Sequence, residues 1–309
     1  MPLLITLACV IAITLIVSYV CFYRIFLSHR PKVTEEYPIP EGEIYEVYRD
    51  QMIKWIKDAR ALPHKDVSVT SYDGLRLCGK YYEYAKGAPV EILFHGYKGT
   101  AERDLSGGIY RCFELGHSVL IVDHRASGSS EGRVITFGAK ERRDCLSWIN
   151  FVVNQIDKDA KIILAGVSMG AATVLMATSM ELPDNVIGVL ADCAYTSTRA
   201  IVKKVMKDMR LPASLLYPFA RLGAILFGGF DPDAASPIKS MEVCHLPVMF
   251  YHGDTDDFVP CSMSEENYGA CTSQKKRLVI IRGAGHGLCL PVDIDTYLSE
   301  AHQFFDPLC

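Results

Sequence analysis

Residues 161–179 have the sequence KIILAGVSMGAATVLMATS, from which the rest of the chain can be interpreted. The apolar run 161–165 has the length of a buried strand, and the small residues at the end of the stretch suit a closely packed helix. Between them lies the pattern G-x-S-x-G, from Gly166 to Gly170. A serine on a sharp strand-to-helix turn needs neighbours without bulky Cβ groups, because the backbone there is strained and tightly packed. Such a turn raises the hydroxyl above the sheet, so we predict a nucleophile at Ser168.

A nucleophilic serine needs a base, and the base needs a carboxylate that orients it. With the serine first in the chain, the acid and the histidine must follow on loops after later strands. His286 lies among small residues after the apolar run 277–281, and we predict that it is the base. Residues 252–260 follow another apolar run and offer three candidate acids, which are Asp254, Asp256 and Asp257. Three carboxylates could also hold a metal ion, but no further ligands lie at metal spacing, so we predict no metal.

The negative charge that develops on a substrate carbonyl oxygen needs two preorganised hydrogen-bond donors. One is expected from the backbone N–H of Met169, the residue after the nucleophile. The other is expected from the loop after an earlier strand, and residues 95–99 follow the apolar run 90–94. We predict that the backbone N–H of Tyr97 is this second donor and that the His95 side chain braces the loop.

Short apolar runs alternate with helical patterns along most of the chain. This alternation predicts an α/β fold with a mostly parallel sheet that is covered on both faces. Residues 194–243 interrupt the alternation, since they contain two helix-like stretches, 198–209 and 213–227, and no strand. Two interpretations of this insertion stay open. It is either a set of extra packing helices or a lid over a pocket at the carboxyl ends of the strands, where ligands of open α/β sheets bind.

The first 23 residues contain no charged side chain, and the stretch from Leu3 to Tyr23 is rich in Leu, Ile and Val. As a helix that stretch spans roughly 30 Å, the thickness of a bilayer core. The rival interpretation, a cleaved signal peptide, lacks a basic start and a clear cleavage site, so we predict a transmembrane anchor in residues 1–29. The basic residues follow the apolar stretch, which places the rest of the chain in the cytoplasm by the positive-inside rule; they are Arg24, His29, Arg30 and Lys32.

Composition narrows the class of protein further. The 309 residues include 32 Lys and Arg against 36 Asp and Glu, a net charge of −4 that argues against a nucleic-acid binder. The eleven cysteines include no CxxC pair, which favours free thiols in a reducing compartment over a disulfide framework. Residues 30–43 contain prolines among charges and are a predicted linker. Residues 44–309 then form one domain that carries the helical insertion at about 194–243.

Taken together, these motifs resemble the α/β-hydrolase superfamily over about residues 65–305. Residues 123–132, DHRASGSSEG, are similar to the D-x-R-G-x-G-x-S-x-G stretch of a membrane-associated branch with a serine-aminopeptidase-like or acyl-ester-hydrolase-like core. Ala126 departs from the glycine of that stretch. The resemblance, which extends to uncharacterised bacterial hydrolases with an N-terminal membrane helix, implies an eight-stranded sheet and no cofactor. It also implies that Asp256 is the acid, because Asp256 follows the family's His-Gly-x-x pattern.

The resulting hypothesis is a membrane-anchored serine hydrolase that cleaves carboxylic esters or thioesters through an acyl-enzyme on Ser168. Its substrate would be a small-molecule or lipid ester. Two alternatives remain. One is an aminopeptidase-like amide hydrolase, since the same three residues serve amide chemistry. The other is a non-catalytic hydrolase-like protein that binds a lipid or a partner at the membrane.

Overall fold

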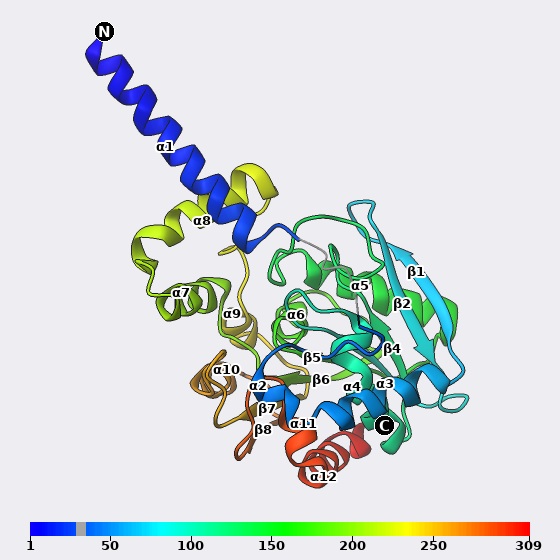
Figure 1. Cartoon of the computed structure of the whole chain (residues 1–309). Coiled ribbons are helices and arrows are strands. Elements are labelled where there is room, and N and C mark those ends of the chain that lie inside the picture. Colours follow the sequence, from blue (N-terminus) through cyan, green and yellow to red (C-terminus); the bar gives the residue numbers. More distant parts are fainter. Residues whose placement is uncertain (29–34) are drawn as a thin grey trace.

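The apolar runs of the sequence form eight strands in the structure, a computed structural model that describes residues 1–28 and 35–309. They are Lys65–Thr70 (β1), Arg76–Tyr82 (β2), Val90–Phe94 (β3), Ser118–Val122 (β4), Ile162–Val167 (β5), Val186–Asp192 (β6), Val248–Gly253 (β7) and Lys276–Ile281 (β8). The strands form one sheet in the order β1-β2-β4-β3-β5-β6-β7-β8, in which only the pairs β1–β2 and β2–β4 are antiparallel (Figure 1). This arrangement confirms the predicted fold class.

The helices of the described residues are Pro2–Ile25 (α1), Glu43–Glu46 (α2), Arg49–Ala61 (α3), Ala101–Glu114 (α4), Glu141–Phe151 (α5), Met169–Ala177 (α6), Thr198–Asp208 (α7), Ala213–Gly228 (α8), Pro237–Met241 (α9), Ser262–Ala270 (α10), Cys289–Val292 (α11) and Ile294–Phe305 (α12), with a π-helical turn at Val152–Ile156 and a 3-10 turn at Asp306–Leu308. Several of them cover the two faces of the sheet. Side chains of α3, α4, α11 and α12 pack on one face, and those of α5, α6 and α9 pack on the other. The central strands β3 and β4 are therefore buried along their whole length, as expected of a sheet covered on both sides.

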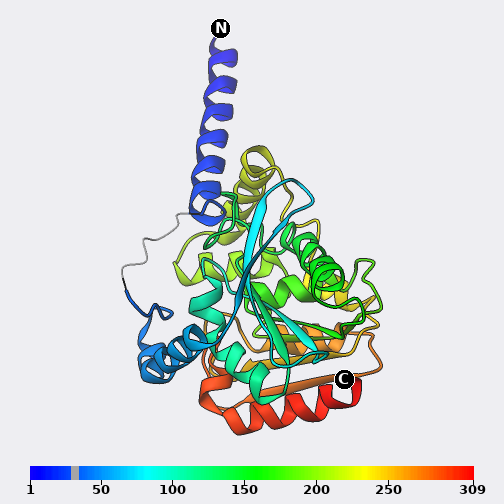
Figure 2. The same ribbon diagram turned by 90° about the vertical axis from the view of Figure 1, so that its right-hand side faces the viewer.

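The N-terminal helix α1 projects away from the rest of the chain (Figures 1 and 2). It is the one helix of the described residues that is long and apolar enough to cross a membrane, with a mean hydropathy of 2.7 in its most apolar window. The backbone after α1 joins the domain directly, because the Ile135 N–H donates to the Phe26 carbonyl and the Ser28 N–H donates to the Arg133 carbonyl, both at 2.8 Å. Part of the predicted linker, residues 30–34, lies outside the described residues.

The apolar spacing of the sequence predicts helices over residues 44–59 and about 137–153, and both have different boundaries in the structure. The first is divided at Val47–Tyr48 into α2 and α3. The helix expected from about residue 137 begins at Glu141, because the Glu141 carboxylate accepts hydrogen bonds from the Thr136 and Gly138 N–H groups, each at 2.8 Å. These bonds hold the preceding residues in a turn with positive φ at Phe137 (52°).

Arg125, in the loop after β4, ties three elements together. Its guanidinium donates to both oxygens of Asp144 in α5, at 2.6 and 2.7 Å, and to both oxygens of Asp73 in the β1–β2 turn, at 2.9 and 3.0 Å. The Arg125 and Asp144 side chains are only 3% exposed. The hydrogen bond from Arg125 is the main reason that the pKa of Asp73 falls to about 2. This network fixes the antiparallel edge of the sheet to the helix layer.

We expect Arg125→Ala to lower the free energy of unfolding by about 3–5 kcal/mol, because it leaves the buried Asp144 without its partner. Urea unfolding of the full chain in detergent, followed by circular dichroism, measures this loss. Lys54→Ala is the control, since it removes an exposed ion pair with Asp58 and should cost less than about 1 kcal/mol. Equal losses in the two variants would contradict a structural role for the Arg125 network.

Candidate active site

Ser168 occupies a strained turn between β5 and α6. Its backbone has φ 55° and ψ −114°, a conformation that a residue with a side chain rarely adopts. The flanking glycines make this turn possible. A Cβ atom on Gly166 would overlap the backbone of Gly170, and one on Gly170 would overlap the carbonyl oxygen of Phe94 at the end of β3. The turn thus depends on backbone contacts that no side chain allows, which is the physical reason for the G-x-S-x-G spacing.

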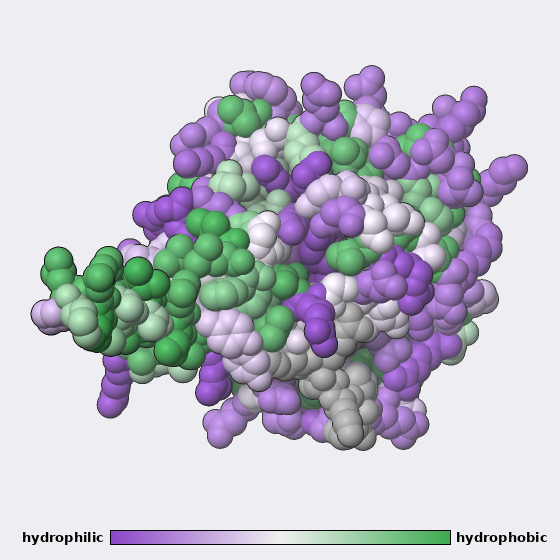
Figure 3. All heavy atoms as spheres, turned by 90° about the horizontal axis from the view of Figure 1, so that it is seen from above, coloured by the Kyte–Doolittle hydropathy of each residue, from purple (hydrophilic) through white to green (hydrophobic). Residues whose placement is uncertain are grey.

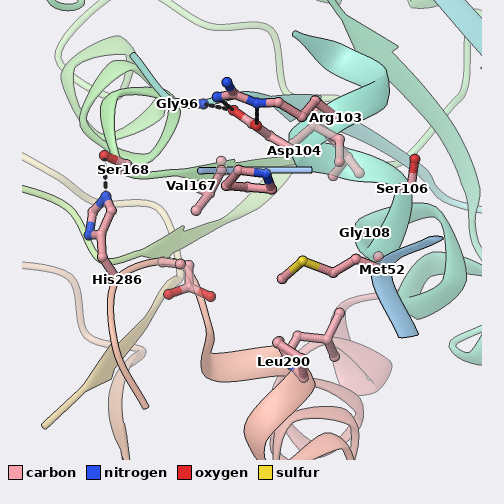
Figure 4. Close-up of a pocket in the computed structure, with 18 of the residues that line it drawn as sticks. Met52, Gly96, Arg103, Asp104, Ser106, Gly108, Val167, Ser168, His286 and Leu290 are labelled. Carbon is pink, nitrogen blue, oxygen red and sulfur yellow. Dashed lines mark hydrogen bonds and ion pairs between the residues drawn. The ribbon is translucent and has the colours of Figure 1, made fainter. Parts of the chain in front are cut away.

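Three of the predicted site residues meet at the carboxyl ends of the parallel strands. The Nε2 atom of His286 lies 2.9 Å from the Oγ atom of Ser168, as drawn in Figure 4. The Nδ1 atom of His286 lies 2.7 Å from the Oδ2 atom of Asp256. Asp256 comes from the loop after β7 and His286 from the loop after β8, in the chain order that the sequence predicts. A carboxylate that accepts from Nδ1–H leaves Nε2 free to accept the serine proton.

The surroundings of Asp256 keep it ionised. Burial alone would raise its pKa, but hydrogen bonds from His252 and His286 outweigh burial and hold the pKa below its ordinary value. The Oδ1 atom of Asp256 also accepts the N–H groups of Phe258, at 3.0 Å, and Val259, at 2.8 Å. The side chain therefore has a fixed orientation and a negative charge to offer the imidazole.

The two competing acids have other positions. Asp254 is exposed, and its Oδ1 atom accepts the Gly283 N–H at 2.6 Å. This bond fastens the loop that carries His286 to the loop that carries Asp256. Asp257 is exposed as well. Of the three aspartates, Asp256 is the one within hydrogen-bond distance of His286.

The loop that contains Tyr97 lies directly beside the serine. A Cβ atom on Gly96 would stand 3.6 Å from the Cβ atom of Ser168. The His95 side chain braces the loop as predicted. Its Nε2 atom accepts the His124 N–H at 3.0 Å, and its Nδ1 atom lies 2.7 Å from the Gly96 carbonyl oxygen. The Gly96 N–H donates to Asp104 at 3.2 Å. Met169 is the first residue of α6, so its N–H has no acceptor within the helix. The roles of the Tyr97 and Met169 N–H groups as oxyanion donors stay predictions.

A pocket of about 560 Å³ opens at Ser168 and His286 and extends along one face of the sheet (Figure 4). Its walls are mostly apolar and come from the central strands and from helices α2, α3, α4, α11 and α12; they include Met52, Trp55, Leu93, Ala165, Leu190 and Leu290. Gly107 in α4 makes room for the wall, since a Cβ atom there would lie 2.8 Å from the Trp55 ring. The inner part is more polar, with Arg111, Asp192 and Tyr297.

The segment that covers this pocket differs from the one that sequence analysis singled out. Within the described part of the chain, the lining includes residues of the 40–55 segment and none of 194–243. The insertion instead packs through α8 against α1 and through α7 against α8. Its role as a lid therefore stays a prediction. The sequence indicates this wall only through the apolar stripe of α3, which includes Met52 and Trp55. The stripe predicts that one face of α3 is buried, but it does not predict which part of the domain that face covers.

One group of side chains near the serine has the composition of a metal site. The Sγ atom of Cys193, a carboxylate oxygen of Asp256 and a ring nitrogen of His286 all lie within 4.8 Å of one another. The hydrogen bond between Asp256 and His286 already accounts for the approach of those two residues. Burial raises the pKa of Cys193 well above its ordinary value, which favours the protonated thiol in this structure. We therefore assign the approach of Asp256 and His286 to the serine–histidine–aspartate arrangement, and the expectation of no metal stays a prediction.

Comparisons with known proteins agree with the fold. No family model matches the chain. The chain is 29% identical over 198 residues to the uncharacterised protein YqkD of Bacillus subtilis, covering 62% of this chain and 63% of YqkD, which is less than two thirds of that protein. It is 29% identical over 128 residues to the thiohydrolase aneE of Aspergillus aculeatus, 40% of each chain.

Solved structures align over most of the chain. The esterase Pf2001 of Pyrococcus furiosus superimposes with a TM-score of 0.69 at 22% identity, covering 91% of this chain and 98% of that structure. The α/β hydrolase GrgF from a Penicillium species superimposes with a TM-score of 0.63 at 18% identity, covering 80% of this chain and 99% of that structure. The chain has the α/β-hydrolase fold.

The contact between Asp256 and His286 predicts which aspartate matters. We expect Asp256→Asn to slow labelling of the full chain by a fluorophosphonate probe by roughly 10⁴-fold, because an amide no longer holds the imidazole in the tautomer that accepts the serine proton. Asp254→Asn is the matched control, since an asparagine oxygen can still accept the Gly283 N–H, and its labelling rate should stay near that of the wild type. A larger loss in the Asp254 variant than in the Asp256 variant would contradict the assignment.

Proposed function

We propose that this protein is a membrane-anchored serine hydrolase that cleaves carboxylic esters or thioesters through an acyl-enzyme on Ser168. The observation that carries the proposal is the hydrogen-bonded series Ser168–His286–Asp256 at the mouth of an apolar pocket. Two of the similar proteins support the reaction class by their names, one an esterase and the other a thiohydrolase. The fold by itself hosts many chemistries, so the site and not the fold carries the argument.

The proposed reaction needs only groups of this chain and water. The Ser168 hydroxyl attacks the carbonyl carbon while His286 Nε2 takes its proton, and Asp256 stabilises the resulting imidazolium. The N–H groups of Tyr97 and Met169 bind the oxyanion. His286 then protonates the leaving alcohol or thiol, which departs and leaves the acyl group on the serine oxygen. A water molecule, deprotonated by His286, releases the acid and restores the serine.

The charges around the pocket favour esters and thioesters over the amides that an aminopeptidase cleaves. A free amino group of such a substrate would need an unpaired negative charge. Asp104 is bound to Arg103 at 2.6 Å, and burial raises the pKa of Asp192, which favours its neutral form. Neither residue offers that charge. The third carboxylate of the lining, Glu41, is exposed to solvent, where an ion pair with an amino group contributes little. The apolar walls suit an acyl or alkyl group instead.

The anchoring part of the proposal rests on α1. Its length and hydropathy match a bilayer core, and the basic Arg24 follows the apolar stretch. All eleven cysteines are free thiols, which fits a reducing compartment. We therefore propose that the catalytic domain faces the cytoplasm.

Turnover of p-nitrophenyl esters of increasing chain length by the full chain in detergent tests the proposed reaction. We expect Ser168→Ala to reduce kcat by at least about 10³-fold, because the nucleophile is lost. Ser106→Ala is the control, since Ser106 lines the same pocket and its hydroxyl donates to the Glu102 carbonyl, away from the reacting atoms.

Two other outcomes would select the alternatives. Probe labelling of Ser168 without turnover of any ester or thioester would favour amide chemistry. A folded protein that neither labels nor turns over ester would favour the non-catalytic alternative and would overturn the proposed function.

The pocket walls predict a chain-length preference. Met52 and Leu290 both line the cavity in Figure 4, and the Met52 side chain extends into it, so a larger side chain at residue 52 should narrow it. We expect Met52→Trp to lower kcat/KM for octanoyl and longer esters about tenfold or more, as lost apolar burial predicts, and to leave acetyl esters within about threefold. Met209→Trp, at a residue 66% exposed outside this pocket, should change neither. Equal losses for short and long esters would contradict the placement of the acyl or alkyl group in this pocket.

A further inference from the structure

Helix α8 has an apolar surface that the rest of the described chain leaves uncovered. Its sequence ASLLYPFARLGAILFG contains one charged residue, Arg221, which is bound to Asp231 through two hydrogen bonds of 2.6 and 2.9 Å. Near its C-terminal end, three consecutive large apolar side chains are 42–52% exposed; they are Ile225, Leu226 and Phe227. Exposed apolar side chains that cluster in this way indicate a partner or a lipid surface.

Helix α8 crosses α1 in close contact. A Cβ atom on Gly223 would overlap the carbonyl oxygen of Ser18, so only a glycine lets the two backbones approach this far. The Phe227 ring packs edge-on against the Tyr19 ring, with 5.2 Å between the ring centres. It also lies tilted against the Phe22 ring, with 6.0 Å between the centres. Ser18 itself is fully buried beneath α8. Seen from above, the hydrophobic surface of α1 continues onto the adjoining part of the domain (Figure 3).

This contact fixes the depth of α8 relative to the bilayer. If α1 crosses the membrane from Leu3 to Tyr23, as the proposed function holds, Ser18 lies five residues, or about 8 Å, inside the end of the span. Gly223 touches Ser18 and therefore shares its depth. Leu226 is less than one turn further along α8, so it lies within about 5 Å of that level. Its exposed side chain then faces lipid rather than water.

We propose that α8 lies in the interfacial layer of the same bilayer that α1 crosses, with the side chains of Ile225, Leu226 and Phe227 among the lipids. The end of α7 and the turn that follows it fit this placement, because exposed basic and apolar side chains lie together there; they are Lys207, Met209, Arg210 and Leu211. The acidic Asp208 among them is paired with Lys204 at 2.7 Å. Apolar residues beside Lys and Arg are typical of segments that bind the headgroup region of anionic membranes. The domain thus has two attachments to the membrane. Helix α1 crosses the bilayer, and α8 lies in its interfacial layer.

Tryptophan quenching by brominated lipids tests this placement in the full chain. The protein is reconstituted into phosphatidylcholine and phosphatidylglycerol nanodiscs with bromines at the 6,7 or the 11,12 acyl positions. Leu226→Trp reports on α8. Tyr84→Trp is the matched control, because the Tyr84 side chain is 50% exposed and that of Leu226 is 52% exposed. Tyr84 lies between β2 and β3, at the end of the sheet opposite to Ser168 and therefore away from the proposed membrane surface. Leu7→Trp, near the N-terminal end of α1, reports on the far end of the span.

The natural tryptophans, Trp55 and Trp148, are at most 5% exposed, and the wild type supplies their background. For Leu226→Trp we expect the added emission to fall about twofold with 6,7-brominated lipid and less with 11,12-brominated lipid, since an interfacial helix lies about 5–10 Å into the acyl boundary. The added emission of Tyr84→Trp should stay unchanged. The added emission of Leu7→Trp should fall with both lipids.

The other outcomes overturn the proposal in distinguishable ways. Quenching of Leu7→Trp without quenching of Leu226→Trp means that α1 spans the membrane and α8 does not touch it. Protection of the tryptophan at position 226 from aqueous iodide would then identify a protein partner, such as a second copy of the chain, and accessibility to iodide would identify water. Absence of quenching at both positions overturns the anchoring and this inference together, while ester turnover by the same samples reports separately on the proposed reaction.

Discussion

The close approach of α6 to the end of β3 sets the geometry of the whole site. Gly170 lies against the carbonyl of Phe94, and no other residue fits that gap. This contact holds Ser168 in its strained conformation and brings the loop at Gly96 against the serine side chain. A strain of this kind costs about 1–3 kcal/mol and persists only when the surroundings enforce it. Here the enforcing elements are strand β3, which is buried throughout, and strand β5, which is buried except at Val167.

Asp256 and His286 are positioned by the same sheet as Ser168, through the loops that follow two other strands. Their loops follow β7 and β8, which end at the same edge as β5 because the three strands run parallel. Asp254 joins these two loops through the Gly283 N–H, and the N–H groups after Asp256 fix its carboxylate. The imidazole thus lies between groups whose positions are set by backbone hydrogen bonds, which preorganises the site at little cost in side-chain entropy.

The sequence predicts the parts of this molecule that depend on local patterns. The strand–serine–helix pattern, the later aspartate and histidine, and the alternation of strands and helices are all of this kind. The pocket wall is different, because the Trp55 ring reaches it only where Gly107 lacks a side chain, a pairing of residues far apart in the chain. The sequence pattern places the start of α5 too early for a related reason. The Glu141 side chain accepts hydrogen bonds from the preceding residues and holds them in a turn, so the helix begins only at Glu141. Tertiary contacts override local preference in both places.

The attachment of α1 connects the proposed membrane anchor with the candidate active site. The Tyr97 hydroxyl donates to the carbonyl of Ile25, in the last turn of α1, at 2.6 Å. Burial, followed by the charge of Arg24, lowers the pKa of the neighbouring Lys98. The loop proposed to supply an oxyanion donor therefore contacts the C-terminal end of α1. If α1 spans a membrane as proposed, a tilt of α1 would act on the loop beside Ser168. Since Tyr97 and Lys98 also line the pocket, an ester substrate would then enter close to the membrane surface.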